Sequence, residues 1–185
     1  MSFDGFLRTG ELLNITWADV SYGFGGKSGV INLLHTKTGQ KNAAYEALPI
    51  LDPMVYSAWK HARASVPRGT SSEHFVYPWQ PQRFRDRFRA ALQALSVDKV
   101  GYRPYSLRRG GATAFYRRTA NLPATVERGR WSSPRVARIY ICDGLGLECE
   151  LQVCSETERL IHQHALNLVA ALKKPVEGYS GGTQH

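Results

Sequence analysis

Apolar residues recur every three or four positions along most of the chain, which is the spacing of one face of an α-helix. This pattern predicts helices at 9–19, 53–63, 81–95, 104–118, 121–129, 133–140 and 155–173. Two extended runs, 30–35 and 44–50, instead flank a polar Lys-Thr-Gly-Gln-Lys turn and predict a β-hairpin. We therefore expect an α+β fold, mainly α, with one small antiparallel sheet that contains the hairpin.

The stretch GRWSSPRVARIYI, residues 129–141, contains a Ser-Ser-Pro helix start. In the helix that follows, Tyr140 shares a stripe with Val136 and Ile139, so we expect it to face inward or into a cleft. Taken alone, the segment favours a core tyrosine whose hydroxyl binds a backbone group. At the other end of the chain, Thr9 is a candidate N-cap for the first helix.

The charge of the chain changes this picture from a plain helical domain to one with a polyanionic partner. The 185 residues include 24 Lys and Arg against 15 Asp and Glu, a formal net charge of +9. Such an excess makes nucleic acid the first candidate partner. Arginines crowd the stretch 83–138, and we assign candidate DNA contacts to Arg83, Arg85, Arg89, Arg109, Arg117 and Arg118.

The cysteines and the hydropathy of the chain bear on its expected cellular location. The 3 cysteines are an odd number with no Cys-x-x-Cys pair, which indicates neither a disulfide framework nor a zinc site. No apolar run approaches a membrane span, and the start lacks the charged-then-apolar order of a signal peptide. We expect an intracellular protein located with genomic DNA, in the nucleus of a eukaryote or the cytoplasm of a prokaryote, with no membrane partner.

Two arginines at helical positions stand out as chemical groups. Arg8 lies at a helix start, and Arg108 lies within YSLRRGGATAF, a helix expected to turn its apolar residues inward at Leu107, Gly111, Ala114 and Phe115. Guanidinium groups present paired donors that match phosphate oxygens, so two converging arginines would clamp one phosphodiester. Lys37, at the hairpin tip, would reach the same place as a proton donor, and Tyr140 would supply an attacking oxygen.

This ordered set resembles the catalytic domain of the tyrosine recombinases, the phage-integrase family. FLRTGELLNITWADV is similar to the family's first-arginine segment, with Arg8 and an acidic residue at Glu11, and HTKTGQKNAAYEALPI to its lysine hairpin, with Lys37. YSLRRGGATAF resembles the His-x-x-Arg helix, with Arg108 as the second arginine. In GRWSSPRVARIY, Trp131 and Tyr140 stand at the family's spacing of nine residues. The resemblance covers nearly the whole chain, and its strength is the shared order and spacing of the segments.

The resemblance implies a DNA breaking-rejoining fold and a site-specific recombinase or integrase that acts through a 3′-phosphotyrosine intermediate. Arg8 and Arg108 would bind the scissile phosphate, Tyr140 would attack the phosphorus, and Lys37 would protonate the departing 5′ oxygen. Trp131 would pack against the tyrosine and donate its indole N–H toward the phosphate. This chemistry requires no metal or other cofactor. The partner is double-stranded DNA, bound as a synaptic tetramer in which the helix 156–173 is a candidate for docking into a neighbouring subunit.

The chain departs from the family pattern in two ways, at one site residue and in its expected domain organisation. Tyr105 stands where the family has histidine, and a phenol with an ordinary pKa of about 10 is a poor general base near neutrality. The chain begins as if in the middle of a helical region, so we expect a catalytic domain at 1–174 with a truncated N-terminal part and a disordered tail at 175–185. The family's separate DNA-clamping domain would be missing.

Two other functions remain open from the sequence. Tyr105 and the abrupt start are compatible with a catalytically inactive DNA-binding relic of a mobile element. The arginine-rich stretch is compatible with an interaction module for RNA or an acidic protein. The geometry separates these hypotheses, since both DNA-based functions require the candidate residues to converge on one basic cleft, at Arg8, Lys37, Arg108, Trp131 and Tyr140.

Overall fold

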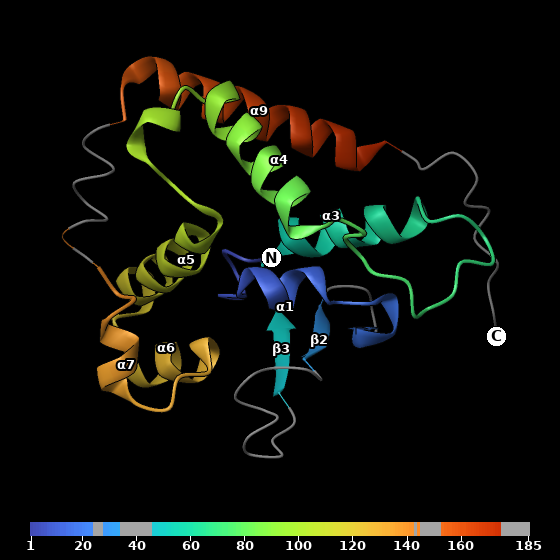
Figure 1. Cartoon of the computed structure of the whole chain (residues 1–185), viewed down its shortest axis with the longest axis horizontal. Coiled ribbons are helices and arrows are strands. Elements are labelled where there is room, and N and C mark those ends of the chain that lie inside the picture. The colour runs from blue at the N-terminus through green and yellow to red at the C-terminus, as the bar shows by residue number, and fades with distance from the viewer. Residues whose placement is uncertain (24–27, 34–45, 143, 145–152, 175–185) are drawn as a thin grey trace.

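The computed structural model describes residues 1–23, 28–33, 46–142, 144 and 153–174. It is a mixed α+β structure, mainly helical, with a small three-stranded antiparallel sheet, as the apolar pattern predicted (Figure 1). The elements in chain order are α1 (Thr9–Leu13), η1 (Trp17–Asp19), β1 (Val20–Tyr22), β2 (Gly29–Leu33), β3 (Glu46–Ile50), α3 (Pro53–Ala64), α4 (Pro81–Ala94), η2 (Asp98–Val100), α5 (Pro104–Thr119), α6 (Leu122–Gly129), α7 (Pro134–Arg138) and α9 (Ser155–Lys173).

The sheet has the order β1-β2-β3, with both pairs antiparallel. The hairpin partners pair with Ile31 opposite Leu48, and both side chains are buried. This confirms the predicted hairpin strands, although the turn between them lies outside the described residues. The sequence pattern did not predict β1, which pairs with β2 through Val20 and Ile31.

Local chemistry fixes the starts of most helices. Prolines occupy the first turn of α3, α4, α5, α6 and α7, where a missing N–H costs no hydrogen bond. Asp52 caps α3, because its Oδ1 accepts from the backbone N–H groups of Met54 and Val55 at 2.8 and 2.9 Å. Ser133 caps α7 in the same way by accepting from Val136. These starts confirm the predicted ones.

Three expectations about the helices are wrong. The N-cap of α1 is Arg8 rather than Thr9, because the Glu11 carboxylate accepts the Arg8 backbone N–H, and the helix already ends at Leu13. The buried residues of α5 include Arg108, Ala112 and Thr113 beside Gly111, whereas Leu107, Ala114 and Phe115 are half-buried. Ile139, expected on the inward stripe of α7, follows the end of that helix and is 66% exposed.

Two apolar clusters lie on either side of the opening segment. One packs the sheet against α3 through residues such as Leu7, Ile31, Leu48 and Trp59, and the other gathers Phe6, Ala112, Trp131 and Ala137 around α5 and α7. The neighbours Phe6 and Leu7 thus belong to different clusters. Close packing on both sides holds this segment in place: a Cβ on Gly5 would meet Leu48, and one on Gly111 would meet the Phe3 carbonyl oxygen. The segment leads directly into Arg8 and α1.

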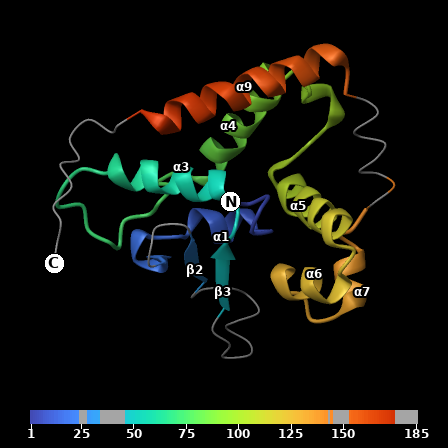
Figure 2. The same cartoon turned by 180° about the vertical axis from the view of Figure 1, so that it is seen from behind.

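The long helix α9 lies at the edge of the molecule, with α5, α6 and α7 grouped apart from the sheet (Figures 1 and 2). It packs against α3. Its apolar side chains Ile161, Leu166 and Leu168 are 45%, 52% and 44% exposed, and Thr157 is its one fully buried residue among those described. In the part of the chain that the structure describes, no helix is both long and apolar enough to cross a bilayer.

Candidate active site

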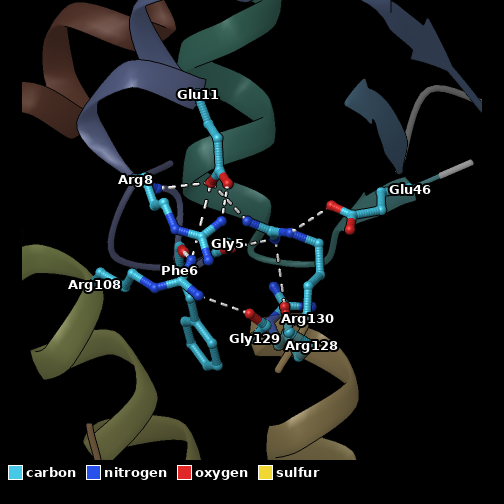
Figure 3. Close-up of polar contacts among 9 residues, drawn as sticks. All are labelled: Gly5, Phe6, Arg8, Glu11, Glu46, Arg108, Arg128, Gly129 and Arg130. Atoms are coloured by element: carbon cyan, nitrogen blue, oxygen red, sulfur yellow. Dashed lines mark hydrogen bonds and ion pairs between the residues drawn. The ribbon is translucent and has the colours of Figure 1, made fainter. Parts of the chain in front are cut away.

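The short helix α1 places Arg8 against Glu11. The backbone N–H of Arg8 donates to Glu11 Oε2 at 2.8 Å, and its Nη1 forms an ion pair with Glu11 Oε1 (Figure 3). The Glu11 side chain is 6% exposed, whereas that of Arg8 is 35% exposed. The carboxylate is therefore an inner anchor, and the Arg8 guanidinium keeps donors that face solvent.

The second candidate arginine, Arg108, lies in the middle of α5 and is fully buried. Its Nη1 donates to the Phe6 carbonyl and its Nη2 to the Gly129 carbonyl at 2.8 Å, while Nη1 lies 3.9 Å from Glu11 Oε2. Its Nε has no hydrogen-bond partner among the described residues. Burial, together with the positive charges of Arg8 and Arg130, lowers the Arg108 pKa to about 10, so the group stays charged at neutral pH.

Trp131 and Tyr140 complete this cluster. Their ring centroids lie 4.8 Å apart, and the Arg108 guanidinium carbon lies 5.0 Å from the Trp131 ring and 5.4 Å from the Tyr140 ring. Trp131 also stacks on Phe6 at 6.0 Å. Its indole Nε1 is buried without a partner in the described part of the chain. The candidate nucleophile therefore rests against a cation and an indole, and its contact with Trp131 is the one that the resemblance implied.

Backbone contacts with α5 fix the segment around Tyr140. Thr113 Oγ1 donates to the Tyr140 carbonyl at 3.3 Å and accepts the Cys142 N–H at 3.1 Å. Arg109, a predicted DNA contact, instead directs Nη2 to Cys142 Sγ at 2.7 Å and to the Ile139 carbonyl at 3.4 Å. These bonds hold the tyrosine segment against the helix that bears Arg108.

Tyr105 lies at the first turn of α5, beside Tyr140, and is 46% exposed. The two ring centroids lie 6.0 Å apart. Burial, a hydrogen bond with Tyr140 and the charge of Tyr140 raise the pKa of Tyr105 above its ordinary value, against the opposing pull of Arg108 and Arg8. The position that the family fills with histidine is therefore a neutral phenol at physiological pH.

Sequence analysis missed two members of the cluster, Arg130 and Glu46. Arg130 Nη2 lies 2.7 Å from Glu11 Oε2, and its Nε forms an ion pair with Glu46 Oε2 at 3.2 Å. The Gly-Arg pair at the end of α6 indicated only a helix stop, because the partner Glu11 lies 119 residues away in the chain. The acidic residue Glu11, three positions after Arg8, was the one signal in the sequence that further cations gather there.

The cluster has more positive than negative charge. Arg8, Arg108 and Arg130 face two carboxylates, those of Glu11 and Glu46. Burial raises the pKa of Glu11, but Arg130 and Arg8 outweigh it and lower that pKa below its ordinary value, so the carboxylate is ionised. Three cations against two anions leave one positive charge uncompensated among the described residues, which favours an anionic ligand beside the exposed face of Arg8.

The remaining predicted residues either fall outside the described residues or lie on α4 and at the end of α5. Lys37 falls in the stretch 34–45, outside the described residues. Arg83, Arg85 and Arg89 lie exposed on α4, where Arg85 binds Gln82 and Arg89 lies 3.8 Å from Asp86. Arg117 and Arg118 are exposed in the last turn of α5. The structure therefore brings together Arg8, Tyr105, Arg108, Trp131 and Tyr140, and Arg109 contacts the segment that carries Tyr140.

A single methyl group at Gly129 should disturb this cluster. A Cβ there would lie 2.0 Å from a ring carbon of Trp131, whose ring is held between Phe6 and Tyr140 and has little room to move. We expect Gly129→Ala to lower the free energy of unfolding by about 1–3 kcal/mol through overpacking, measured by urea denaturation. The matched variant Gly10→Ala meets nothing within 4 Å and should cost less; equal losses in the two variants would contradict this account.

Comparison of the sequence with protein-family models and with curated proteins finds no match. Within the residues that the structure describes, no group of three or more His, Cys, Asp or Glu side chains could hold a metal ion.

Proposed function

We propose that this chain is a DNA breaking-rejoining enzyme of the tyrosine-recombinase type. More particularly, we propose a site-specific recombinase or integrase catalytic domain that cuts and rejoins duplex DNA through a 3′-phosphotyrosine. The observation that carries the proposal is the cluster of Arg8, Arg108, Trp131 and Tyr140, which come from three separate segments of the chain and meet around Glu11 and Phe6.

The electrostatics of the cluster support a phosphate as its ligand. Arg8 is one of three arginines that outnumber the two carboxylates of the cluster, and its side chain is 35% exposed and can meet a ligand from solvent. Two buried N–H groups, Arg108 Nε and Trp131 Nε1, lack partners in the described part of the chain and lie beside the Tyr140 ring. Donors that are already oriented can stabilise charge that develops on a phosphate in the transition state.

The proposed reaction is a transesterification. Tyr140 Oη bonds to phosphorus while the bond from phosphorus to the 5′ oxygen breaks, so the DNA gains a 3′-phosphotyrosine and a free 5′-hydroxyl. The phenol proton passes to a solvent water as the bond forms, and Lys37 would supply a proton to the leaving oxygen. Arg8 and Arg108 stabilise the extra negative charge on the phosphate. Attack by a 5′-hydroxyl reverses these steps and rejoins the strand.

A second candidate function, a catalytically inactive DNA-binding relic, is favoured by a specific observation. The Nη atoms of Arg108 are both engaged by backbone carbonyls, and Tyr105 supplies a neutral phenol where a base is expected. The third hypothesis, an RNA- or protein-binding arginine module, gives no reason for Arg108 to pack against both the Trp131 and Tyr140 rings. We retain the active recombinase as the main proposal.

Incubation with a nicked suicide duplex tests the proposal. Such a substrate loses its 5′-hydroxyl fragment after cleavage, so the covalent intermediate accumulates and migrates as a protein–DNA adduct on a denaturing gel. An adduct supports the recombinase. Tight duplex binding without any adduct supports the relic, and preferential binding of RNA supports the interaction module.

The exposed arginines of α4 and of the last turn of α5 should bind DNA through its phosphates. We propose Arg83, Arg85, Arg89, Arg117 and Arg118 as these contacts. Displaced counterions make such binding steeply dependent on salt. We expect affinity for a nonspecific duplex to fall about tenfold or more between roughly 50 and 200 mM salt, measured by fluorescence anisotropy. An affinity that stays flat over this range would argue against a phosphate-tracking surface.

Assembly and location follow the same proposal. Synapsis of two DNA sites would require four copies, and α9 presents the exposed apolar residues Ile161, Leu166 and Leu168 for contact with a neighbouring copy. The protein would act on genomic DNA inside the cell.

A further inference from the structure

The backbone conformation at Arg130 favours glycine rather than arginine. It follows the last residue of α6 with φ +54°, in the left-handed region. Glycine is the usual residue at such a helix end, and any other residue is strained by roughly 1–2 kcal/mol. The side chain is nevertheless only 8% exposed. The explanation for arginine at this position lies in what its side chain contacts.

The guanidinium of Arg130 joins three separate segments of the chain (Figure 3). Nη2 binds Glu11 Oε2 of α1 at 2.7 Å, and Nη1 donates to the Gly5 carbonyl at 3.3 Å. Nε lies 3.2 Å from Oε2 of Glu46. Glu46 is the first residue of β3 and the first described residue after the stretch that contains Lys37. One side chain therefore contacts the opening segment, the carboxylate that anchors Arg8, and the start of a hairpin strand.

The two carboxylate oxygens of Glu11 have different partners, and Arg130 determines which oxygen remains for the Arg8 guanidinium. Arg130 and the Arg8 backbone N–H occupy Oε2, and the Arg8 guanidinium reaches only Oε1. Without Arg130, Oε2 would keep only the Arg8 backbone N–H as a close partner, so the carboxylate could turn to bind the Arg8 guanidinium through both oxygens and withdraw its donors from solvent. The charge would change as well: Arg8 and Arg108 against Glu11 and Glu46 leave two cations and two anions, with no excess.

We propose that Arg130 is a positioning residue of the proposed phosphate site: it holds Glu11 so that the Arg8 guanidinium stays available to a phosphate, and it ties Glu46 at the start of β3 to the same point. The inference rests on the proposed recombinase function for its catalytic consequence. The arrangement of Glu11 can be tested without that function.

Four variants of the full chain make the test specific. Arg130→Gly removes the side chain and suits the left-handed backbone. Arg130→Met removes the charge, and Arg130→Lys retains it without the forked donors. Arg128→Met is the matched control, because Arg128 is equally buried, two residues away, and binds Asp4 at 3.1 Å rather than Glu11.

The first readout is the ¹³C NMR titration of the Glu11 carboxyl carbon, assigned with Glu11→Gln and recorded without DNA. We expect the Glu11 pKa to rise in Arg130→Gly and Arg130→Met, because burial then opposes ionisation with one cation fewer. Arg130→Lys should recover part of the shift. A Glu11 titration unchanged by loss of Arg130, or changed equally by Arg128→Met, would overturn the inference.

The second readout is the rate of adduct formation at saturating suicide duplex. We expect Arg130→Gly and Arg130→Met to slow it on the order of a hundredfold through misplacement of Arg8, with partial recovery in Arg130→Lys and little change in Arg128→Met. Adding Glu11→Gln to Arg130→Met should slow it little further, because both act on the same contact. Full-rate adduct in Arg130→Gly would overturn the proposed role, whereas a parent protein that forms no adduct refutes the proposed function and leaves the titration to test Arg130.

Discussion

The Tyr140→Phe protein should bind duplex DNA with the parent's affinity and form no covalent adduct. The change removes one hydroxyl and retains the ring that packs 4.8 Å from Trp131 and beneath the Arg108 guanidinium. No other oxygen in the cluster is proposed to attack phosphorus, so the loss of adduct should be complete rather than partial. Anisotropy with an intact duplex and a denaturing gel with a suicide duplex measure the two properties on one preparation.

A matched tyrosine controls for the loss of a phenol as such. Tyr116 lies further along α5, outside the cluster, and Tyr116→Phe should keep both binding and adduct formation. Adduct that survives in Tyr140→Phe would refute the assignment of the nucleophile. Both variants retain the aromatic ring, so both should bind duplex DNA. Loss of binding in Tyr140→Phe would contradict the view that the ring alone maintains the packing at this position.

The second large effect is expected at the neighbouring tyrosine and has the opposite sign. Tyr105→His replaces a neutral phenol with an imidazole whose ordinary pKa is about 6.5. The half-exposed position can accept the smaller ring. Adduct formation should be unchanged or rise by roughly tenfold to a hundredfold where acid–base assistance limits the rate.

The pH profile distinguishes this explanation from a change in packing. A base works in its neutral form, and burial at this position, together with the nearby charges of Arg108 and Arg8, would lower the pKa of an imidazole. The rate for Tyr105→His should therefore rise with pH through a midpoint below about 6.5 and then level off, a step absent from the parent. Tyr105→Phe provides the control, since it removes the hydroxyl and adds no base. If neither the parent nor Tyr105→His traps DNA, the inactive relic becomes the better account.

Features with local causes were predictable from the sequence. The Ser-Ser-Pro start of α7, the first-turn prolines of α4 and α5, and the strands of the hairpin all depend on residues within a few positions of each other. The juxtaposition of Arg8, Arg108, Trp131 and Tyr140 was predicted only because their order and spacing resemble a known family.

Features with distant causes were not predictable. A pattern of apolar residues cannot indicate that α5 buries Arg108. The guanidinium donates its hydrogen bonds to the Phe6 carbonyl, 102 residues away, and to the Gly129 carbonyl, 21 residues away. Arg130 likewise finds Glu11 and Glu46 only in three dimensions. The strand β1 was missed because its three residues, Val20–Tyr22, are too few for a period-two pattern.

The two carbonyl partners of Arg108 also set an order of events during synthesis. One comes from Phe6, which precedes Arg108 in the chain, and the other from Gly129, which follows it. A buried guanidinium without both partners would be strongly destabilised, so α5 cannot adopt its final place until α6, which ends at Gly129, has emerged. A nascent chain that stops before Gly129 therefore holds no assembled cluster, and Arg108 meets the Trp131 and Tyr140 rings only after α6 and the segment that follows it have been made.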